Sequence, residues 1–209
     1  MNIIRNIFYA ILLGVSMAAC LSQQDEATTA SGVTEPTEKA TPGNNSNASA
    51  AIPAPANFKI KGKQVGTVKI GMLVTELRNN VPAGMAITDT TLTQEGQQST
   101  AYILRPEGSD KGLLVEQRCQ QECQVWRISV LSQNYKTAKG LGVGSKYGEL
   151  QNAYKISSVS FEEGNVVAVA PEAGMSFIMD HGQLADQQLN NISATTLPAN
   201  TVVKKVLVY

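Results

Sequence analysis

The sequence predicts an α+β fold, an antiparallel β-sheet with a few short helices, built from two related half-domains. Three observations predict it. Short β-rich runs broken by Gly, Pro and Asn begin at Phe58, two helical segments resemble each other, and strand candidates follow each helix. Because helices usually cover one face of such a sheet, we expect residues 58–209 to form a single domain.

The internal repeat consists of Ile70–Val81 and Val143–Tyr154, which coincide at four of twelve positions without gaps. The spacing predicts half-repeats over about 66–138 and 139–209. Each segment reads as a strand end, a turning glycine and a helix of two to three turns. The apolar positions that share one helical face are Leu73, Leu77 and Val81, then Tyr147, Leu150 and Tyr154. Ser145 is suited to cap the second helix, whereas Met72 cannot cap the first.

Strand candidates follow each helix, and tight turns separate those of the second half. The predicted strands are Ala101–Leu104, Leu113–Gln117, Val125–Leu131, Val166–Ala170, Met175–Met179 and Val202–Val208. Glu162–Asn165 and Pro171–Gly174 carry the Gly, Asn and Pro that hairpin turns require.

The N-terminus has the pattern of a secretion signal. Arg5 provides a charged start, and a run of 13 residues from Ile7 to Ala19 is apolar and ends in small side chains. A run of this length is too short to cross about 30 Å of hydrocarbon as a helix. Residues 1–19 are therefore predicted to be a signal peptide that is removed on export.

The stretch Val15–Cys20 resembles the lipobox of bacterial lipoproteins, with Met17 in place of the usual aliphatic residue. The resemblance implies that Cys20 receives a diacylglycerol, that the signal is cut before it, and that the new amine is acylated, for example with palmitate. Several acyl chains would hold the protein on a lipid bilayer. Leu21 and Ser22 lack the aspartate that retains lipoproteins in the inner membrane, which favours the outer membrane of the cell envelope.

The segment after the lipidated cysteine, up to residue 57, is predicted to be a disordered tether. It holds four prolines, no aromatic residue and few large aliphatic residues. As a coil, its 37 residues would span roughly 30 to 37 Å. We expect it to act as a passive spacer, with a recognition segment as the alternative.

The balance of charge bounds the possible partners. Lys plus Arg equals Asp plus Glu at 17 each, and the balance holds over the domain as well, so nucleic acid is not an expected partner. Three cysteines and one histidine leave little material for a metal cage or a nucleophile triad. No cofactor is expected.

Two short patterns resemble known envelope proteins. Lys136–Ser145, with Val125–Val130 before it, resembles an element of uncharacterised bacterial envelope lipoproteins. Val68–Met72 is similar to the helix starts of small outer-membrane assembly lipoproteins and β-lactamase-inhibitor-like domains. These resemblances imply a binding or assembly role.

Cys119 and Cys123 flank a predicted hairpin tip, and in an oxidising compartment they are expected to form a disulfide bond. The C-x-x-x-C spacing disfavours a redox pair, and two thiols without histidine fall short of a zinc site.

No catalytic residue is assigned. The glycines Gly140, Gly142 and Gly144 match no phosphate-binding motif and read as turn residues. His181, beside Asp180, reads as a loop or surface residue, and the pair Glu162 and Glu163 as solvent-exposed. The aromatic residues expected in the core or at its rim are Tyr102, Trp126, Tyr135, Tyr147, Tyr154 and Phe161.

The sequence therefore predicts a membrane-anchored envelope lipoprotein whose domain is a non-catalytic module for an unknown protein or glycan. Two alternatives stay open. One is a cell-wall or polysaccharide hydrolase that uses carboxylates, and the other is an inhibitor of an exported enzyme.

Overall fold

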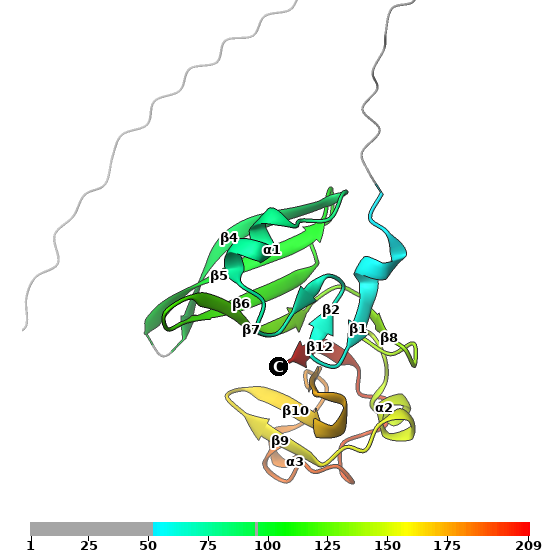
Figure 1. Ribbon diagram of the computed structural model, residues 1–209. Helices are drawn as coiled ribbons and strands as arrows, with labels where there is room; N and C mark the ends of the chain where they lie inside the picture. The colour runs from blue at the N-terminus through cyan, green and yellow to red at the C-terminus, as the bar shows by residue number, and fades with distance from the viewer. Residues whose placement is uncertain (1–51, 95) are drawn as a thin grey trace, which may run out of the picture. The chain divides into compact units, whose positions relative to one another are not determined.

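The computed structural model describes residues 52–94 and 96–209 (Figure 1). The predicted signal peptide, Cys20 and nearly all of the predicted tether lie outside the described residues. The strands are β1 (Lys59–Lys61), β2 (Gln64–Val65), β3 (Val68–Lys69), β4 (Met85–Gln94), β5 (Gln97–Pro106), β6 (Leu113–Cys119), β7 (Cys123–Val130), β8 (Lys136–Thr137), β9 (Ser158–Glu162), β10 (Asn165–Ala170), β11 (Met175–Met179) and β12 (Val203–Val208). The helices are η1 (Pro55–Phe58), α1 (Val74–Asn79), α2 (Tyr147–Ala153), η2 (Pro171–Ala173) and α3 (Asp186–Asn190).

The larger sheet has eight antiparallel strands in the order β4-β5-β6-β7-β12-β11-β10-β9. Four strands follow α1 and four follow α2, and the two groups meet where β7 pairs with β12. The structure therefore confirms an antiparallel sheet with a few short helices.

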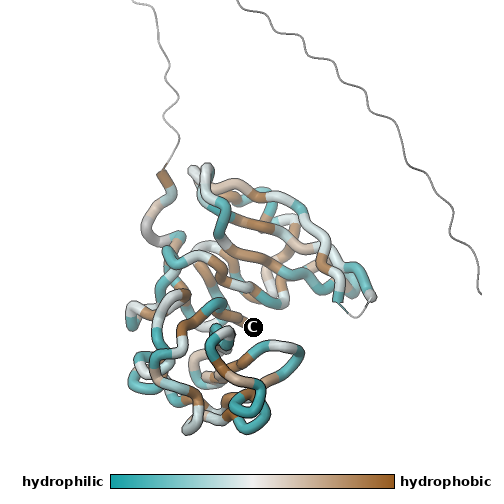
Figure 2. Tube along the Cα trace, turned by 180° about the vertical axis from the view of Figure 1, so that it is seen from behind, coloured by the Kyte–Doolittle hydropathy of each residue, from teal (hydrophilic) through white to brown (hydrophobic). Residues whose placement is uncertain are grey.

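One face of this sheet is covered, and its residues form rows that cross the strands. The first row is Leu104, Leu113, Val130, Val206, Phe177, Ala168 and Val159. All of these side chains are buried and belong to one hydrophobic core, together with Val74 and Leu77 of α1 and Tyr147 and Leu150 of α2. The strands are brown along much of their length in Figure 2, whereas their hairpin tips are teal. Apolar residues alternate with polar ones along the strands, so one face of the sheet is apolar. Helices α1 and α2 pack on that face.

A second sheet, with the order β3-β2-β1-β8, packs on the same core. Its inner row consists of Val68, Val65, Ile60 and Thr137, all at most 5% exposed. We call this element the small sheet. It begins directly after η1, so it is the first sheet that the chain enters from its N-terminal side (Figure 1).

The six predicted strands correspond to β5, β6, β7, β10, β11 and β12. The residue pattern does not predict β4, β9, α3 or the strands of the small sheet. β4 is rich in threonine and alternates weakly, and the small-sheet strands have only two or three residues. Such short or weakly patterned segments owe their structure to their neighbours in the sheet rather than to their own sequence.

Two predicted details of the helices are wrong. Ser145 does not cap α2, because its hydroxyl accepts a hydrogen bond from the Gly142 N–H at 3.1 Å. Carbonyl groups of Thr201 and Ala199 satisfy the first N–H groups of α2 instead, at 2.8 and 2.9 Å. In α1, Val74 rather than Leu73 is buried with Leu77, because the helix starts one residue later than the apolar spacing indicates.

Candidate functional site

The opposite face of the eight-stranded sheet has its own row of residues, which crosses every strand from β4 to β9. The row is Thr88, Ile103, Leu114, Ser129, Leu207, Ser176, Val169 and Ser158. None of its aliphatic members, Ile103, Leu114, Leu207 and Val169, belongs to the hydrophobic core or packs against it. We call this surface the uncovered face.

The row on the uncovered face carries no charged side chain. Every member of its row is an aliphatic residue, a serine or a threonine, and none carries a charge. Ser129 and Ser176, which lie on either side of Leu207, are only 1% and 5% exposed. The row is therefore a mixture of four aliphatic and four hydroxyl side chains without charge, and charged residues are depleted at the cores of protein interfaces.

A β-bulge re-aims one side chain toward this face. Glu116 pairs with Arg127, but the next residue, Gln117, pairs with Val125, so Trp126 is the extra residue of β7. A bulge changes the direction in which a side chain points and is common beside functional sites.

Trp126 lies between two cationic side chains. The guanidinium carbons of Arg118 and Arg127 lie 4.5 and 4.6 Å from the centre of its ring. Cation–π contacts of this kind contribute about 0.5 to 2 kcal/mol each. Together with Glu116, these residues form the Arg–Trp cluster, in which Trp126 keeps a partly exposed ring.

The Arg–Trp cluster is held in place by one buried carboxylate. Glu116 is 6% exposed and accepts two hydrogen bonds from Arg127, at 2.8 and 2.6 Å. Two parallel bonds from one guanidinium fix its orientation and satisfy both carboxylate oxygens. Arg118 has no carboxylate partner among the described residues, so its N–H groups remain open to a ligand.

A hollow of about 790 Å³ adjoins the cluster at the tip of the β6–β7 hairpin. Arg118 and Trp126 line it together with hairpin residues 120–122, Gln124 and Val125, and with Ile70 and Gly71 of the segment before α1. Gly71 and Met72 are hydrogen-bonded to the backbone of Val125, at 2.7 and 2.9 Å. The wall of the hollow is therefore made by hydrogen-bonded backbone and mostly polar side chains.

Cys119 and Cys123 lie at disulfide distance, as expected, with the sulfur atoms 2.02 Å apart. They face each other in the register of β6 and β7, with their Cα atoms 4.0 Å apart. The pair closes the hairpin that forms most of the hollow.

The other candidate residues lie apart from this site. The Nε2 atom of His181 is 2.9 Å from the Gly164 carbonyl, and its ring lies beside Phe161. Asp180 accepts a hydrogen bond from the Gly182 N–H instead of contacting His181. Glu162 and Glu163 are exposed.

The three glycines form a turn as expected. Gly140 and Gly144 have positive φ angles of 77° and 88°. A Cβ atom at Gly142 would lie 2.3 Å from the Tyr135 carbonyl oxygen, so only glycine fits there.

The residue pattern predicts Trp126 in the core or at its rim but does not single out Arg118, Arg127 or Glu116. Their alternation along β6 and β7, opposite to Val115 and Ile128, was the available signal. The bulge that brings Trp126 beside both arginines has no signal in the residue pattern, because it arises from the pairing of two strands.

Within residues 52–94 and 96–209, no helix has the length and apolar character needed to cross a membrane. The same residues hold no group of three or more His, Cys, Asp or Glu side chains suited to a metal ion.

Comparison with known proteins identifies the fold but no family. No family model matches the sequence, and no curated protein matches it. The structure is similar to the crystal structure of the uncharacterised protein YfeY from Escherichia coli, with a TM-score of 0.52 and 16% sequence identity. The match covers 72% of this chain and 97% of YfeY, so the two domains share a fold.

Proposed function

We propose that this chain is a lipid-anchored envelope protein whose domain binds a protein partner through the uncovered face. The observation that carries the proposal is the uncharged row that crosses all eight strands beside the Arg–Trp cluster. Trp, Arg and Tyr residues dominate the energetics of protein interfaces. The Arg–Trp cluster beside an uncharged row of aliphatic and hydroxyl side chains therefore has the composition of a binding centre.

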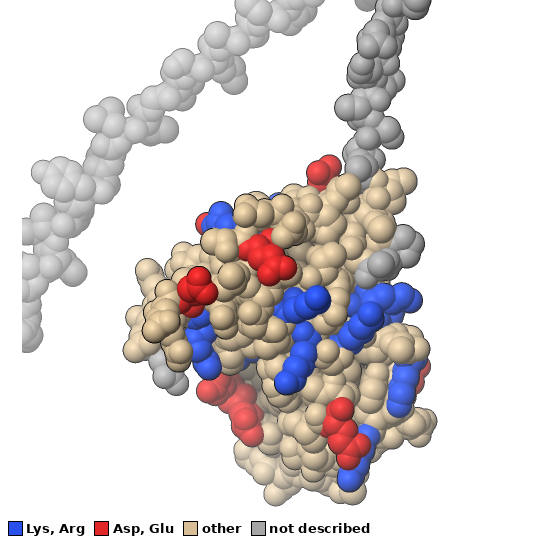
Figure 3. Space-filling model, in the orientation of Figure 1, with Lys and Arg blue, Asp and Glu red and all other residues tan. Residues whose placement is uncertain are grey.

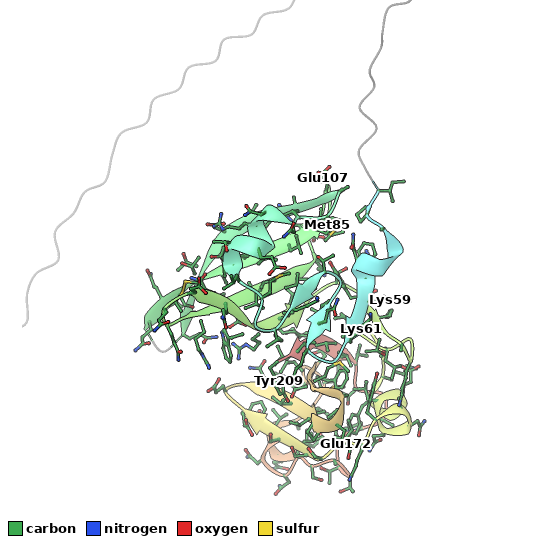
Figure 4. The ribbon with its side chains drawn as sticks, viewed as in Figure 1. Lys59, Lys61, Met85, Glu107, Glu172 and Tyr209 are labelled. Carbon is green, nitrogen blue, oxygen red and sulfur yellow. A yellow bond between two sulfur atoms is a disulfide. The ribbon has the colours of Figure 1, made fainter. Side chains whose placement is uncertain are left out.

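Tyr209 extends the same surface. It directly follows β12, is 41% exposed, and its hydroxyl lies 2.9 Å from that of Ser176, a member of the row (Figure 4). The hydrogen bond fixes the ring, so binding a partner costs little side-chain entropy. The face therefore offers a pre-organised aromatic residue near the middle of the sheet.

The lipid anchor rests on the pattern around Cys20. Mass spectrometry of the N-terminal peptide from envelope-derived protein is expected to show a diacylglyceryl group and an acyl chain on Cys20. An unmodified thiol, or a mature chain that starts elsewhere, would contradict the anchor. Fractionation of the envelope is expected to place the chain in the outer membrane.

Crosslinking tests the binding proposal. The tagged full chain is crosslinked in intact envelopes, purified, and its partners are identified by mass spectrometry. Trp126→Ala and Leu207→Ser are expected to lose the partner, whereas Phe161→Ala is expected to keep it. Phe161 is a matched control because it is 39% exposed and pairs with Val166, a core residue of the covered face. Equal capture by all variants, or no specific partner, would contradict the proposal.

An inhibitor of an exported enzyme is one form that this partner binding could take, and titration against exported hydrolases tests it. The hydrolase alternative stays a prediction that no observation favours. Among the described residues Glu116 is the one buried carboxylate, and Arg127 occupies both of its oxygens.

We further propose that residues 66–138 and 139–209 are related half-domains. In each, a helix of about two turns precedes four antiparallel strands of the larger sheet, and the last of these four, β7 or β12, meets the other at the centre of that sheet. An experimental structure whose second half superposes on the first in this order would support the relation. A superposition that needs a different strand order would contradict it.

A further inference from the structure

The small sheet carries an unusual concentration of lysines on its outer face. Between Phe58 and Thr75 the sequence has four lysines and no acidic residue. The overall balance of charge in the domain hides this local excess. The exposed lysines are Lys59, Lys61, Lys63 and Lys69.

The register of the strands places these side chains on one face. In β1 the pattern is exposed, buried, exposed, so Lys59 and Lys61 point away from the core that Ile60 enters. Lys61 pairs with Gln64, and Gln64 pairs with Lys69, which gives an outer row across three strands.

Two more lysines complete the surface. Lys59 pairs with Lys136 of β8, and Lys63 occupies the turn between β1 and β2 with a φ angle of 60°. We call these five residues the lysine face. In Figure 3 blue side chains gather where the small sheet lies, and Figure 4 places Lys59 and Lys61 beside β1.

The lysine face is not neutralised within the part of the chain that the structure describes. No side chain of the five lies within 4.0 Å of a described carboxylate. The segment packed nearest to the β1–β2 turn is η2, and its acidic residue, Glu172, pairs with Lys155 at 3.4 Å. Like charges placed opposite each other in a sheet are destabilising, so the fold bears a cost for this arrangement. A uniform positive surface of this kind attracts a polyanion.

We infer that the lysine face docks on an anionic lipid surface, an inference that rests on the proposed lipid anchor at Cys20. The tether is expected to end at residue 57, and β1 begins at Lys59, so the anchored end of the domain is also its basic end. A tether that spans roughly 30 to 37 Å keeps the lysine face at high effective concentration near the bilayer. A weak attraction between each lysine and the anionic lipids is therefore enough to keep the domain docked on the bilayer.

The docked orientation also complements the proposed function. A bilayer held against the small sheet contacts residues that lie outside the row on the uncovered face. The lipid and the protein partner would then use different surfaces of one domain, and neither would exclude the other.

Vesicle sedimentation tests the inference without the anchor. The exported chain carrying Cys20→Ser is mixed with vesicles of phosphatidylglycerol and phosphatidylcholine, or of phosphatidylcholine alone. We expect binding to the anionic vesicles, and its loss as the salt concentration rises past about 0.15 M. Binding to phosphatidylcholine vesicles of equal strength would overturn the inference.

Matched variants assign the binding to the lysine face. The variant with Lys59→Gln, Lys61→Gln, Lys63→Gln and Lys69→Gln is expected to bind anionic vesicles at least about tenfold more weakly, since each lysine contributes to the attraction. The control variant with Lys111→Gln, Lys146→Gln, Lys204→Gln and Lys205→Gln has the same net charge and removes three exposed lysines and one half-buried lysine. It is expected to bind within about twofold of the parent. Equal weakening in the two variants would overturn the inference.

Two further readouts separate this inference from its alternatives. Circular dichroism checks that both quadruple variants stay folded, and the single change Lys69→Glu gives a smaller loss at the end of β3 should the quadruple variant unfold. Binding of heparin through the same lysines without binding to anionic vesicles would overturn the lipid surface in favour of an acidic glycan. An unmodified Cys20 in the native protein would remove the anchor while leaving the vesicle result intact.

Discussion

The uncovered face and the lysine face are both sheet surfaces without a second layer, yet they differ in chemistry. Beneath each lies a row of buried and mostly aliphatic residues, so the alternation that builds the fold is the same in both. On the outward side, one row is uncharged and the other is basic. In the Arg–Trp cluster a carboxylate and a ring fix the arginines, whereas the lysines have no such partners among the described residues. The inward residues therefore set the fold, and the outward residues set what each surface binds.

The largest expected effect comes from changing one residue on each side of the eight-stranded sheet and comparing the two losses of stability. Phe177→Ala is expected to lower the free energy of unfolding by about 3 to 5 kcal/mol, because Phe177 is fully buried in the core. Leu207→Ser, on the uncovered face, is expected to cost only about 1 kcal/mol while it abolishes partner capture. Urea unfolding measures both, and equal costs would show that the second face is structural.

Tyr135 tests how tightly the small sheet covers the core. It is buried against Phe58, with ring centres 5.2 Å apart, and burial raises its pKa to about 12. Because the unfolded phenol ionises near pH 10, stability is full below that pH and falls by roughly 1.4 kcal/mol per pH unit as the pH rises toward 12.

Unfolding measured from pH 9 to 12 is expected to show this slope in the parent chain and a smaller one in Tyr135→Phe. Tyr147 retains part of the slope, because burial raises its pKa as well. The Tyr135 hydroxyl has no hydrogen-bond partner among the described residues, so the phenylalanine variant is expected to be at least as stable at pH 7. An unchanged slope would show that the small sheet opens readily.

Removing the carboxylate of the Arg–Trp cluster is expected to have an intermediate effect on the free energy of unfolding. Glu116→Gln removes the charge that holds Arg127 and is expected to cost about 2 kcal/mol. Glu122→Gln, at the exposed hairpin tip, is expected to change stability by less than about 0.5 kcal/mol. Trp126 is the single tryptophan in the chain, so its fluorescence reports directly on any rearrangement of the cluster. An unchanged emission spectrum in Glu116→Gln would mean that the ion pair does not order the indole.

The smallest effect sharpens the contrast between the two faces. Lys59→Gln removes the charge opposite Lys136 and is expected to raise stability by a few tenths of a kcal/mol. Lys111→Gln, in an exposed loop, serves as the control and is expected to leave stability unchanged. Thermal unfolding at low salt measures the difference. A loss of stability in Lys59→Gln would mean that the lysine has a structural role.

Much of the fold could be predicted from the residue pattern, and the reasons are local. Runs such as Val166–Ala170 and Met175–Met179 are aliphatic, short and bounded by turn residues, and both are strands. β4 could not be predicted this way, because four of its ten residues are threonine and only its ten pairs with β5 make it a strand. The cap of α2 escaped prediction for a similar reason, since its partners come from Ala199 and Thr201, far along the chain.

The candidate sites also differ in how far they could be predicted, according to whether their residues are close in sequence or meet only in the folded sheet. Cys119 and Cys123 are near in sequence, and their disulfide distance could be predicted from a hairpin alone. The uncharged row could not, because its eight residues come from eight strands and meet only once the strand order is known. The lysine face lies between these cases. Its residues are close in sequence, but their common direction depends on the pairing of four short strands.

The junction of β7 and β12 has a consequence for how the chain matures. Only three residue pairs join the two groups of four strands within the sheet, and Val206 meets Val130 across a long sequence separation. Contacts so distant in sequence form slowly. Until β12 arrives, β7 and β11 each present a bare edge beside apolar side chains, which is the kind of edge on which chains aggregate. A newly synthesised molecule is therefore most prone to aggregate at the centre of its own sheet, and a chaperone would protect it most by shielding that gap.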